Sequence, residues 1–187
     1  MGETVLVRGA VAVATAGALG LVVVAAAAAA WLVGGRAFEA GAPTDAPAAV
    51  PAAGSGPTTV ELSLDALGHP LHLAVRERLQ AYFDAVNAHD HAAWAATVTP
   101  ERVAAQPAEI WLAGVRSTQD GTIRVDRIED IADGVLALVR FTSTQDLADA
   151  PADLRVGRIC WRSALPMTGA GLAIGAGAPG STLSRPC

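Results

Sequence analysis

The chain has 187 residues, of which 52% are hydrophobic and only 17% are charged. It carries 18 acidic and 13 basic residues, and because every basic residue is an arginine the sequence contains no lysine. A chain with a net charge of −5 and no basic stretch lacks the electrostatic pattern of a nucleic-acid-binding protein, so no nucleic-acid partner is expected. The length suffices for one domain that folds around a hydrophobic core without a metal or other cofactor.

Residues 10–33 form an uncharged run whose only polar side chain is that of Thr15. As a helix, these 24 residues would measure about 36 Å, enough to cross a hydrocarbon core of about 30 Å. Trp31, near the end of the run, suits the interface between lipid and water. The run therefore predicts a single transmembrane helix in the cell membrane, preceded by a cytoplasmic tail over residues 1–9.

A cleaved signal peptide is the alternative interpretation of the same run. The apolar core of a signal peptide normally has about 7–15 residues and is followed at once by a small-x-small cleavage site. Here the nearest such triplet, residues 40–42, is followed by Pro43, which suits a signal peptidase poorly. We favour an uncleaved anchor with the N-terminus inside and the C-terminal domain outside, and cleavage stays open.

Residues 34–59 are dominated by alanine, proline and glycine. Such a segment buries too little apolar surface to offset the entropy lost on ordering, so it predicts a proline-stiffened linker. The remaining residues, 60–187, are expected to form one extracytoplasmic domain.

The first half of that domain has the periodicity of helices. Apolar residues recur at intervals of three and four from Leu71, which predicts an amphipathic helix of about 18 residues. Asp90 is placed to cap a second, short helix. Thr99 followed by Pro100 predicts the start of another helix, which Pro107 then interrupts.

The second half changes to the periodicity of strands. A weak strand signal at residues 60–64 precedes the helices, and three long strands are expected at residues 122–128, 135–144 and 154–165. Asp133-Gly134 predicts a hairpin between the first two, and residues 172–174 a short last strand. Helices followed by a meander of strands predict an α+β domain with an antiparallel sheet.

A resemblance to a known superfamily is carried by residues 75–94, which read VRERLQAYFDAVNAHDHAAW. A long helix ending in YFDAVNAHD, then a short helix with Trp94, is similar to the opening of the nuclear transport factor 2-like superfamily. That superfamily includes SnoaL-like polyketide cyclases and ketosteroid isomerases. The resemblance covers roughly residues 70–176, and it implies a cone-shaped domain in which helices pack on a curved antiparallel sheet.

The order of anchor, linker and domain also resembles membrane-anchored actinobacterial members of that superfamily, among them the Mce-associated proteins that accompany lipid importers. This resemblance implies an accessory or binding role in the cell envelope. An envelope protein partner and a hydrophobic, lipid-like small ligand both stay open, as does a dimer.

Two cysteines stand far apart in the sequence, Cys160 in a predicted strand and Cys187 in the glycine- and proline-rich tail. If the domain lies outside the cytoplasm, a disulfide between them would fasten the tail to the sheet. The alternative is a buried Cys160 thiol and a free Cys187.

The four histidines predict surface or capping roles and no metal site. They flank the two ends of the first long helix, about 25 Å apart, so they cannot share one metal ion: His69, His72, His89 and His91. A further group of charged residues is expected to form a cross-strand lattice on the outer face of the sheet: Arg124, Asp126, Arg140, Arg158 and Arg162.

Six aromatic residues are candidates to line the interior of the cone: Tyr82, Phe83, Trp94, Trp111, Phe141 and Trp161. Enzymes of the resembled superfamily place an acid–base aspartate or histidine there, often with a tyrosine. Here Asp84 lies about 200° round the helix from Tyr82, so the two would not converge. The sequence offers no catalytic pair, and it predicts a binding or scaffolding domain that is not an enzyme. The alternative is a membrane-tethered isomerase or cyclase that acts on a hydrophobic small molecule.

Overall fold

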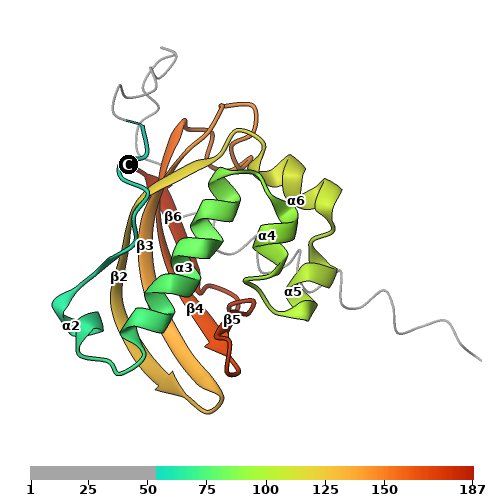
Figure 1. Ribbon diagram of the computed structural model, residues 1–187. Coiled ribbons are helices and arrows are strands. Elements are labelled where there is room, and N and C mark those ends of the chain that lie inside the picture. Colours follow the sequence, from blue (N-terminus) through green and yellow to red (C-terminus); the bar gives the residue numbers. More distant parts are fainter. Residues whose placement is uncertain (1–53) are drawn as a thin grey trace, which may run out of the picture. The chain divides into compact units, whose positions relative to one another are not determined.

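The computed structural model describes residues 54–187 (Figure 1). The predicted cytoplasmic tail, the transmembrane run at residues 10–33 and most of the predicted linker lie outside the described residues. Within residues 54–187, no helix combines the length and the apolar character that a membrane span requires.

Helices precede the long strands along the chain, so the α+β class predicted from the sequence is confirmed. The helices are α2 (Leu64–Leu67), α3 (His72–Asn87), α4 (His91–Ala95), α5 (Pro100–Ala105) and α6 (Ala108–Val115). The strands are β1 (Glu61–Leu62), β2 (Gln119–Ile131), β3 (Gly134–Thr144), β4 (Arg158–Thr168), β5 (Ala173–Ile174) and β6 (Thr182–Pro186).

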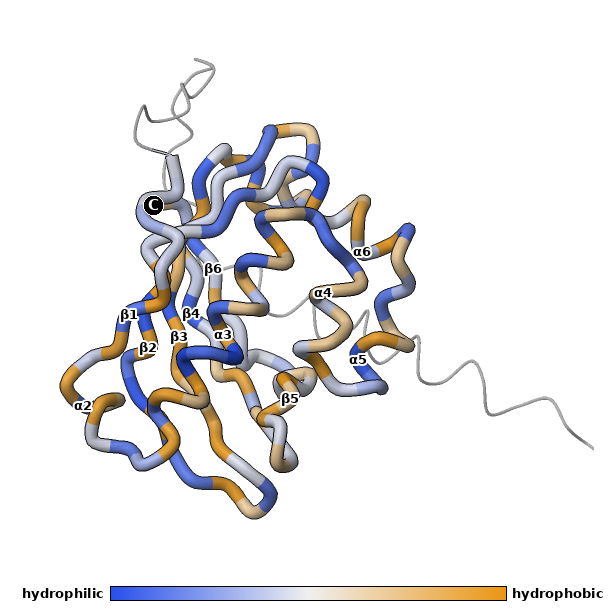
Figure 2. The backbone as a smooth tube through the Cα atoms, in the orientation of Figure 1, coloured by the Kyte–Doolittle hydropathy of each residue, from blue (hydrophilic) through white to orange (hydrophobic). Residues whose placement is uncertain are grey.

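Helix α3 is the helix expected from the apolar repeat that starts at Leu71. Its hydropathy colours alternate along the helix in Figure 2, and its buried side chains include Val75, Leu79 and Phe83. This apolar face packs on the sheet, and the shorter helices α4, α5 and α6 lie beside α3 (Figure 1). The predicted cap of α4 is also present, because the Asp90 side chain accepts a hydrogen bond of 3.0 Å from the Ala93 backbone N–H.

The strands form one curved, unclosed sheet in the order β1-β2-β3-β4-β5, and β6 also pairs with β4. The expectation of a purely antiparallel sheet is wrong, because β1 pairs with β2 in parallel while the other pairs are antiparallel. The parallel pairing is possible because helices α2 to α6 separate β1 from β2 in the chain, which gives the crossover length that a tight hairpin lacks. The sheet is therefore mixed.

Side chains alternate between the two faces of β3 and β4. Val135, Ala137 and Val139 of β3 are buried against the helices, whereas Arg140 lies on the opposite, outer face. In β2 this alternation is interrupted by two register shifts, one between Gly121 and Arg124 and one between Val125 and Arg127. Each shift inserts one extra residue and so exchanges the faces of the residues beyond it.

The C-terminal part of the domain differs from the expected arrangement. The third long strand was expected over residues 154–165, but β4 begins at Arg158 and continues through Thr168. The tail is not irregular throughout, because β6 pairs with β4 over five residues from Ile159 to Ser163. A proline, Pro186, is tolerated there because β6 pairs on one side with β4 and has no other strand neighbour among residues 54–187.

Candidate functional site

A cavity of about 420 Å³ lies between the inner face of the sheet and helices α3, α5 and α6. Its lining combines apolar and aromatic residues with several polar ones: Tyr82, Phe83, Val86, Arg102, Gln106, Ile110, Trp111, Gly114, Val115, Thr118, Asp120, Phe141, Ser143, Gln145, Asp149, Pro151, Trp161, Ser163, Leu165 and Thr182. The volume falls in the range of small-molecule sites, about 300–1,000 Å³.

Aromatic rings make a continuous wall along one side of this cavity. The Phe83 ring contacts Tyr82 and Phe141 edge to face, with ring centroids 5.2 and 5.0 Å apart. Phe141 in turn stacks on Trp161, its neighbour across β3 and β4, at 6.0 Å. Edge-to-face and stacked pairs at these separations are favourable, so the wall is a rigid apolar surface.

Five of the six aromatic residues singled out in the sequence line the cavity, and Trp94 does not. Trp94 is fully buried and packs at 5.2 Å against Trp111, with the His91 ring 5.3 Å away. This packing fixes α4 against α6, so Trp94 positions Trp111 without lining the cavity itself. Trp111 is itself 4% exposed, which places most of its ring in the core and only an edge at the cavity.

Asp120 is a buried carboxyl group on the inner face of the sheet, and it lines the cavity. The side chain of Asn87, at the end of α3, forms hydrogen bonds with both the N–H and the carbonyl group of the Asp120 backbone. The Asn87 Oδ1 atom accepts a hydrogen bond of 2.7 Å from the Asp120 N–H, and the Asn87 Nδ2 atom donates one of 3.0 Å to the Asp120 carbonyl. The hydroxyl of Ser143, directly opposite on β3, donates to the Asp120 Oδ1 atom.

Burial raises the pKa of the Asp120 carboxyl to about 6, and the hydrogen bond from Ser143 opposes this only in part. The cause is the loss of solvation, which disfavours the charged form. A carboxyl group with such a pKa changes its ionisation close to neutral pH, so it can accept or donate a proton there. Within residues 54–187, no hydrogen bond is made to the second carboxyl oxygen, Oδ2.

Arg102 and Tyr82 supply a second polar group at the cavity. The Arg102 NH2 atom donates a hydrogen bond of 3.0 Å to the Tyr82 hydroxyl, and its guanidinium lies over the Tyr82 ring at 5.3 Å. The NH1 atom of the same guanidinium is buried without a hydrogen-bond partner among the described residues. Arg102 therefore retains an unused donor beside the cavity, and an unpaired buried donor is costly.

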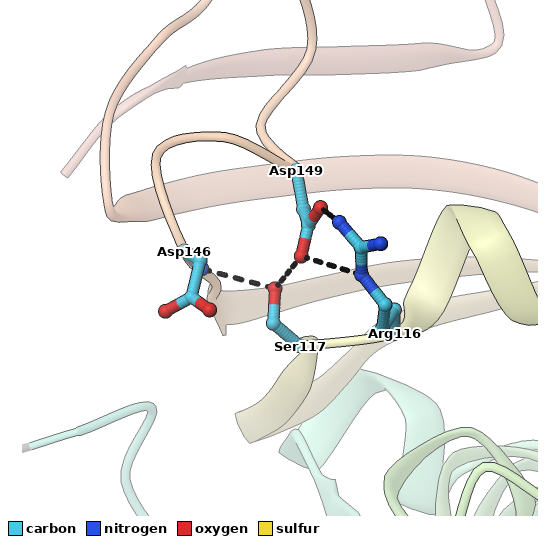
Figure 3. Close-up of polar contacts among 4 residues, drawn as sticks. All are labelled: Arg116, Ser117, Asp146 and Asp149. Carbon is cyan, nitrogen blue, oxygen red and sulfur yellow. Dashed lines mark hydrogen bonds and ion pairs between the residues drawn. The ribbon is translucent and has the colours of Figure 1, made fainter.

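Asp149, which lines the cavity, is the centre of a polar cluster (Figure 3). Arg116 pairs with the Asp149 carboxylate, and the Ser117 hydroxyl donates to it at 2.7 Å. The same Ser117 oxygen accepts a hydrogen bond of 3.0 Å from the backbone of Asp146. The guanidinium of Arg116 and then the hydroxyl of Ser117 hold the pKa of the Asp149 carboxyl below its usual range. These contacts fasten the loop after β3 to the end of α6.

The histidines lie where the sequence suggested, at the two ends of α3, and each has a hydrogen-bond partner. No group of three or more histidine, cysteine, aspartate or glutamate side chains within residues 54–187 is arranged to hold a metal ion. The partners are the Asp130 carboxylate for His69, and backbone carbonyls of residues 69, 118 and 106 for His72, His89 and His91.

Cys160 and Cys187 lie at disulfide distance, with Cα atoms 5.1 Å apart. Cys160 lies on the outer face of β4, and Cys187 directly follows β6. The pair therefore joins two strands that already share a ladder of hydrogen bonds.

Asp120 and Arg102 are the site residues that the sequence did not reveal. Alternation counted backwards from Ile123 and Val125 places residue 120 on the outer face, but the extra residue between Gly121 and Arg124 returns it to the inner face. A bulge of this kind leaves no clear mark on the pattern of apolar residues. The available signal was the Asp120-Gly121 pair at the point where the alternation begins.

Comparison with known proteins identifies no relative of this chain: no protein-family model, curated protein or solved structure matches it.

Proposed function

We propose that this protein is a membrane-anchored, extracytoplasmic binding protein whose nuclear transport factor 2-like domain holds a small, largely apolar molecule in the cavity lined by Asp120. The proposal rests on the resemblance of residues 75–94 and on the order of helices and curved sheet along the chain. The function is binding, and the protein serves an accessory role in the cell envelope.

The cavity itself is the observation that carries this proposal. A domain of this size can fill its interior with side chains, yet an opening of about 420 Å³ remains beside the aromatic wall. Phe83, Phe141 and Trp161 would contact the apolar part of a ligand, and contact with rigid aromatic rings costs little conformational entropy.

The polar groups define which apolar molecules suit the cavity. Asp120 offers a carboxyl oxygen, and Arg102 offers an unused N–H. Both groups lose hydration on burial and gain a partner if the ligand carries a hydroxyl or carbonyl group. The ligand class is therefore a ring system or lipid-like molecule with one or two such oxygens.

Substitution of Gly114 tests the cavity without removing any of its contacts. Gly114 lines the cavity on α6, and a Cβ atom at this position meets no atom within 4 Å. A Gly114→Leu side chain would occupy this space, and we expect it to weaken binding of the probe 2-naphthol about tenfold. Binding is measured by equilibrium dialysis of the full-length chain, with the same non-ionic detergent on both sides of the membrane.

The matched control is Ala113→Leu, which adds a leucine at an exposed position of the same helix that does not line the cavity. It should bind 2-naphthol as the wild type does. Equal binding by Gly114→Leu and wild type, or no binding by the wild type, would remove the basis of the proposal.

A second candidate function is acid–base catalysis on the bound molecule, as in a SnoaL-like isomerase or cyclase. The specific observation in its favour is the pKa of about 6 for Asp120, which suits a general base near neutral pH. Under this second candidate, the full-length chain should exchange the acidic C1 protons of 2-tetralone for deuterium in D₂O, an exchange that NMR can follow. Asp120→Asn should slow this exchange by about 100-fold or more. A rate equal to that of buffer for the wild type would exclude the enzyme and leave the binding proposal intact.

The placement outside the cytoplasm is supported by the cysteine pair. Disulfides persist in oxidising compartments and are rare where glutathione keeps thiols reduced. Cys160 and Cys187 at disulfide distance therefore favour a domain on the outer side of the membrane. In this location the domain meets its ligand or an envelope partner while the run at residues 10–33 holds it to the membrane.

A further inference from the structure

The outer face of the sheet carries a groove of about 580 Å³ that the proposed binding function does not use. Its floor is formed by β2, β3 and β4, one wall by residues 57–61 and the other wall by β6. The two walls belong to the two ends of the described chain, which lie close together in Figure 1. Four arginines line this groove: Arg124, Arg140, Arg162 and Arg185.

Three of these arginines stand in a row across three strands. Arg124 of β2 is the register partner of Arg140, and Arg140 is the register partner of Arg162. Like charges directly opposite one another destabilise a sheet. The row is therefore unfavourable for the isolated domain wherever no acid compensates it.

The neighbouring acids compensate two of the three arginines in the row. Glu61 of β1 lines the groove and is the register partner of Arg124. Asp126 lies 3.5 Å from the Nε atom of Arg124 and 3.3 Å from that of Arg140. This part of the expected charge lattice is confirmed. Arg162 and Arg185 form no ion pair with any residue of the described range 54–187, although both are exposed in a chain with a net charge of −5. The charges of Arg162 and Arg185 can therefore pair with a ligand without breaking an ion pair within the described residues.

The groove also holds its donors in fixed positions. The Arg124 side chain is positioned by Asp126, whose carboxylate lies 3.5 Å from the Arg124 Nε atom. Arg185 is held by the pairing of β6 with β4, next to the Cys160–Cys187 pair. The opposite wall is fixed to β2, because the Thr122 N–H donates to the Pro57 carbonyl at 2.7 Å. A binding site that is already ordered loses little entropy when a ligand enters.

We propose that this groove binds a small molecule that carries phosphate groups. Guanidinium groups match the geometry of phosphate oxygens with paired N–H donors, and they stay charged at every pH at which the protein is folded. The volume is that of a small-molecule site, and the two walls keep a flat surface such as a membrane away from the floor of the groove. Both features favour a soluble phosphate compound over the headgroups of an anionic membrane.

The test measures binding of pyrophosphate to the full-length chain in non-ionic detergent by isothermal titration calorimetry. The variant R162Q/R185Q removes two charges that form no ion pair, so it should fold, and its thermal midpoint without ligand should not fall. We expect this variant to bind pyrophosphate at least about tenfold more weakly than the wild type. The wild-type affinity should fall as salt is raised.

The matched control is Arg76→Gln, which removes one charge at an exposed position of α3, on the other side of the sheet. It should bind pyrophosphate like the wild type. The proposal is wrong if R162Q/R185Q binds as tightly as the wild type, or if R76Q weakens binding to the same extent. It is also wrong if vesicles of phosphatidylglycerol bind the groove while pyrophosphate does not, because the partner would then be a membrane.

Discussion

Asp120 combines a buried position with a carboxyl group that loses most of its hydration in the fold. Its pKa is about 6, whereas the pKa of an aspartate in an unfolded chain is about 3.9. Below the lower value the carboxyl group is protonated in both the folded and the unfolded state, so folding buries no charge. Between the two values the folded state binds more protons, so stability falls as the pH rises. Above the upper value the full cost of the buried charge remains.

Replacement of Asp120 by asparagine should therefore stabilise the protein at about pH 7.5 and have little effect at about pH 4. Asparagine keeps an oxygen that can accept the Ser143 hydrogen bond but carries no charge. The expected gain at the higher pH is about 3 kcal/mol at most, from the difference between the two pKa values. The measurement is urea unfolding of wild type and variant at several pH values, followed by tryptophan fluorescence.

The difference between the two proteins isolates Asp120, because carboxyl groups such as Asp149 contribute equally to both. Asp149 has a lowered pKa, so its own contribution is present at neutral pH and is lost as the pH falls. Asp153→Asn, at an exposed carboxyl group, serves as the control and should leave the pH profile unchanged. Parallel profiles for wild type and Asp120→Asn would contradict the assignment.

Individual residues were the hardest level to predict. The role of Asp90 as a cap could be predicted, because a cap depends on its immediate neighbours in the chain. The position of Asp120 could not, because it depends on a bulge whose extra residue changes the face of the strand. Arg102 was missed for a related reason: its contact is with Tyr82, which lies 20 positions earlier in the chain and on another helix.

At the scale of elements, α3 is the helix on which the domain is built. Its apolar face packs against the inner face of the sheet, and Leu79 on that face is fully buried. Leu73, less than two turns earlier in the same helix, is 58% exposed. The two leucines share a helix and differ in burial, which makes them a matched pair.

Leu79→Ala should lower the free energy of unfolding by about 2–5 kcal/mol, because it removes buried methylene groups and leaves a cavity. Leu73→Ala should change it by no more than about 0.5 kcal/mol. Both substitutions improve helix propensity equally, so the difference reports packing alone. Urea unfolding curves give both values, and similar losses for the two variants would mean that α3 does not pack by the face described.

Elements defined by local sequence were predicted well. The length of α3 follows from its apolar repeat, and the hairpin between β2 and β3 follows from Asp133-Gly134. Strand β6 was missed because its residues are exposed and lack alternation, so its only structural signal is the partner strand β4. The parallel pairing of β1 is likewise a contact between distant segments, and the two residues of β1 carry no local pattern that predicts it.

At the scale of the whole molecule, the sequence predicts a protein held in the membrane by residues 10–33. The full-length chain should therefore remain in the membrane pellet after an alkaline carbonate wash. A variant without residues 10–33 should move to the soluble fraction, because the driving force for insertion lies in that run. Immunoblotting of the two fractions measures both outcomes.

The matched control deletes residues 34–45, which belong to the linker and leave the apolar run intact. It should stay in the pellet. A soluble wild-type chain whose N-terminal residue lies beyond residue 33 would show that the run is a cleaved signal peptide, and an intact soluble chain would show that it is no membrane segment at all.

The alternation of side chains in β3 and β4 has a consequence for the two binding surfaces. Arg140 and Phe141 are consecutive residues, as are Trp161 and Arg162. In each pair the arginine lines the groove, and the aromatic residue lines both the groove and the cavity. A single thickness of backbone thus separates the two sites. If a ligand on one side displaces that backbone, thermodynamic reciprocity requires each ligand to change the affinity of the other by the same factor.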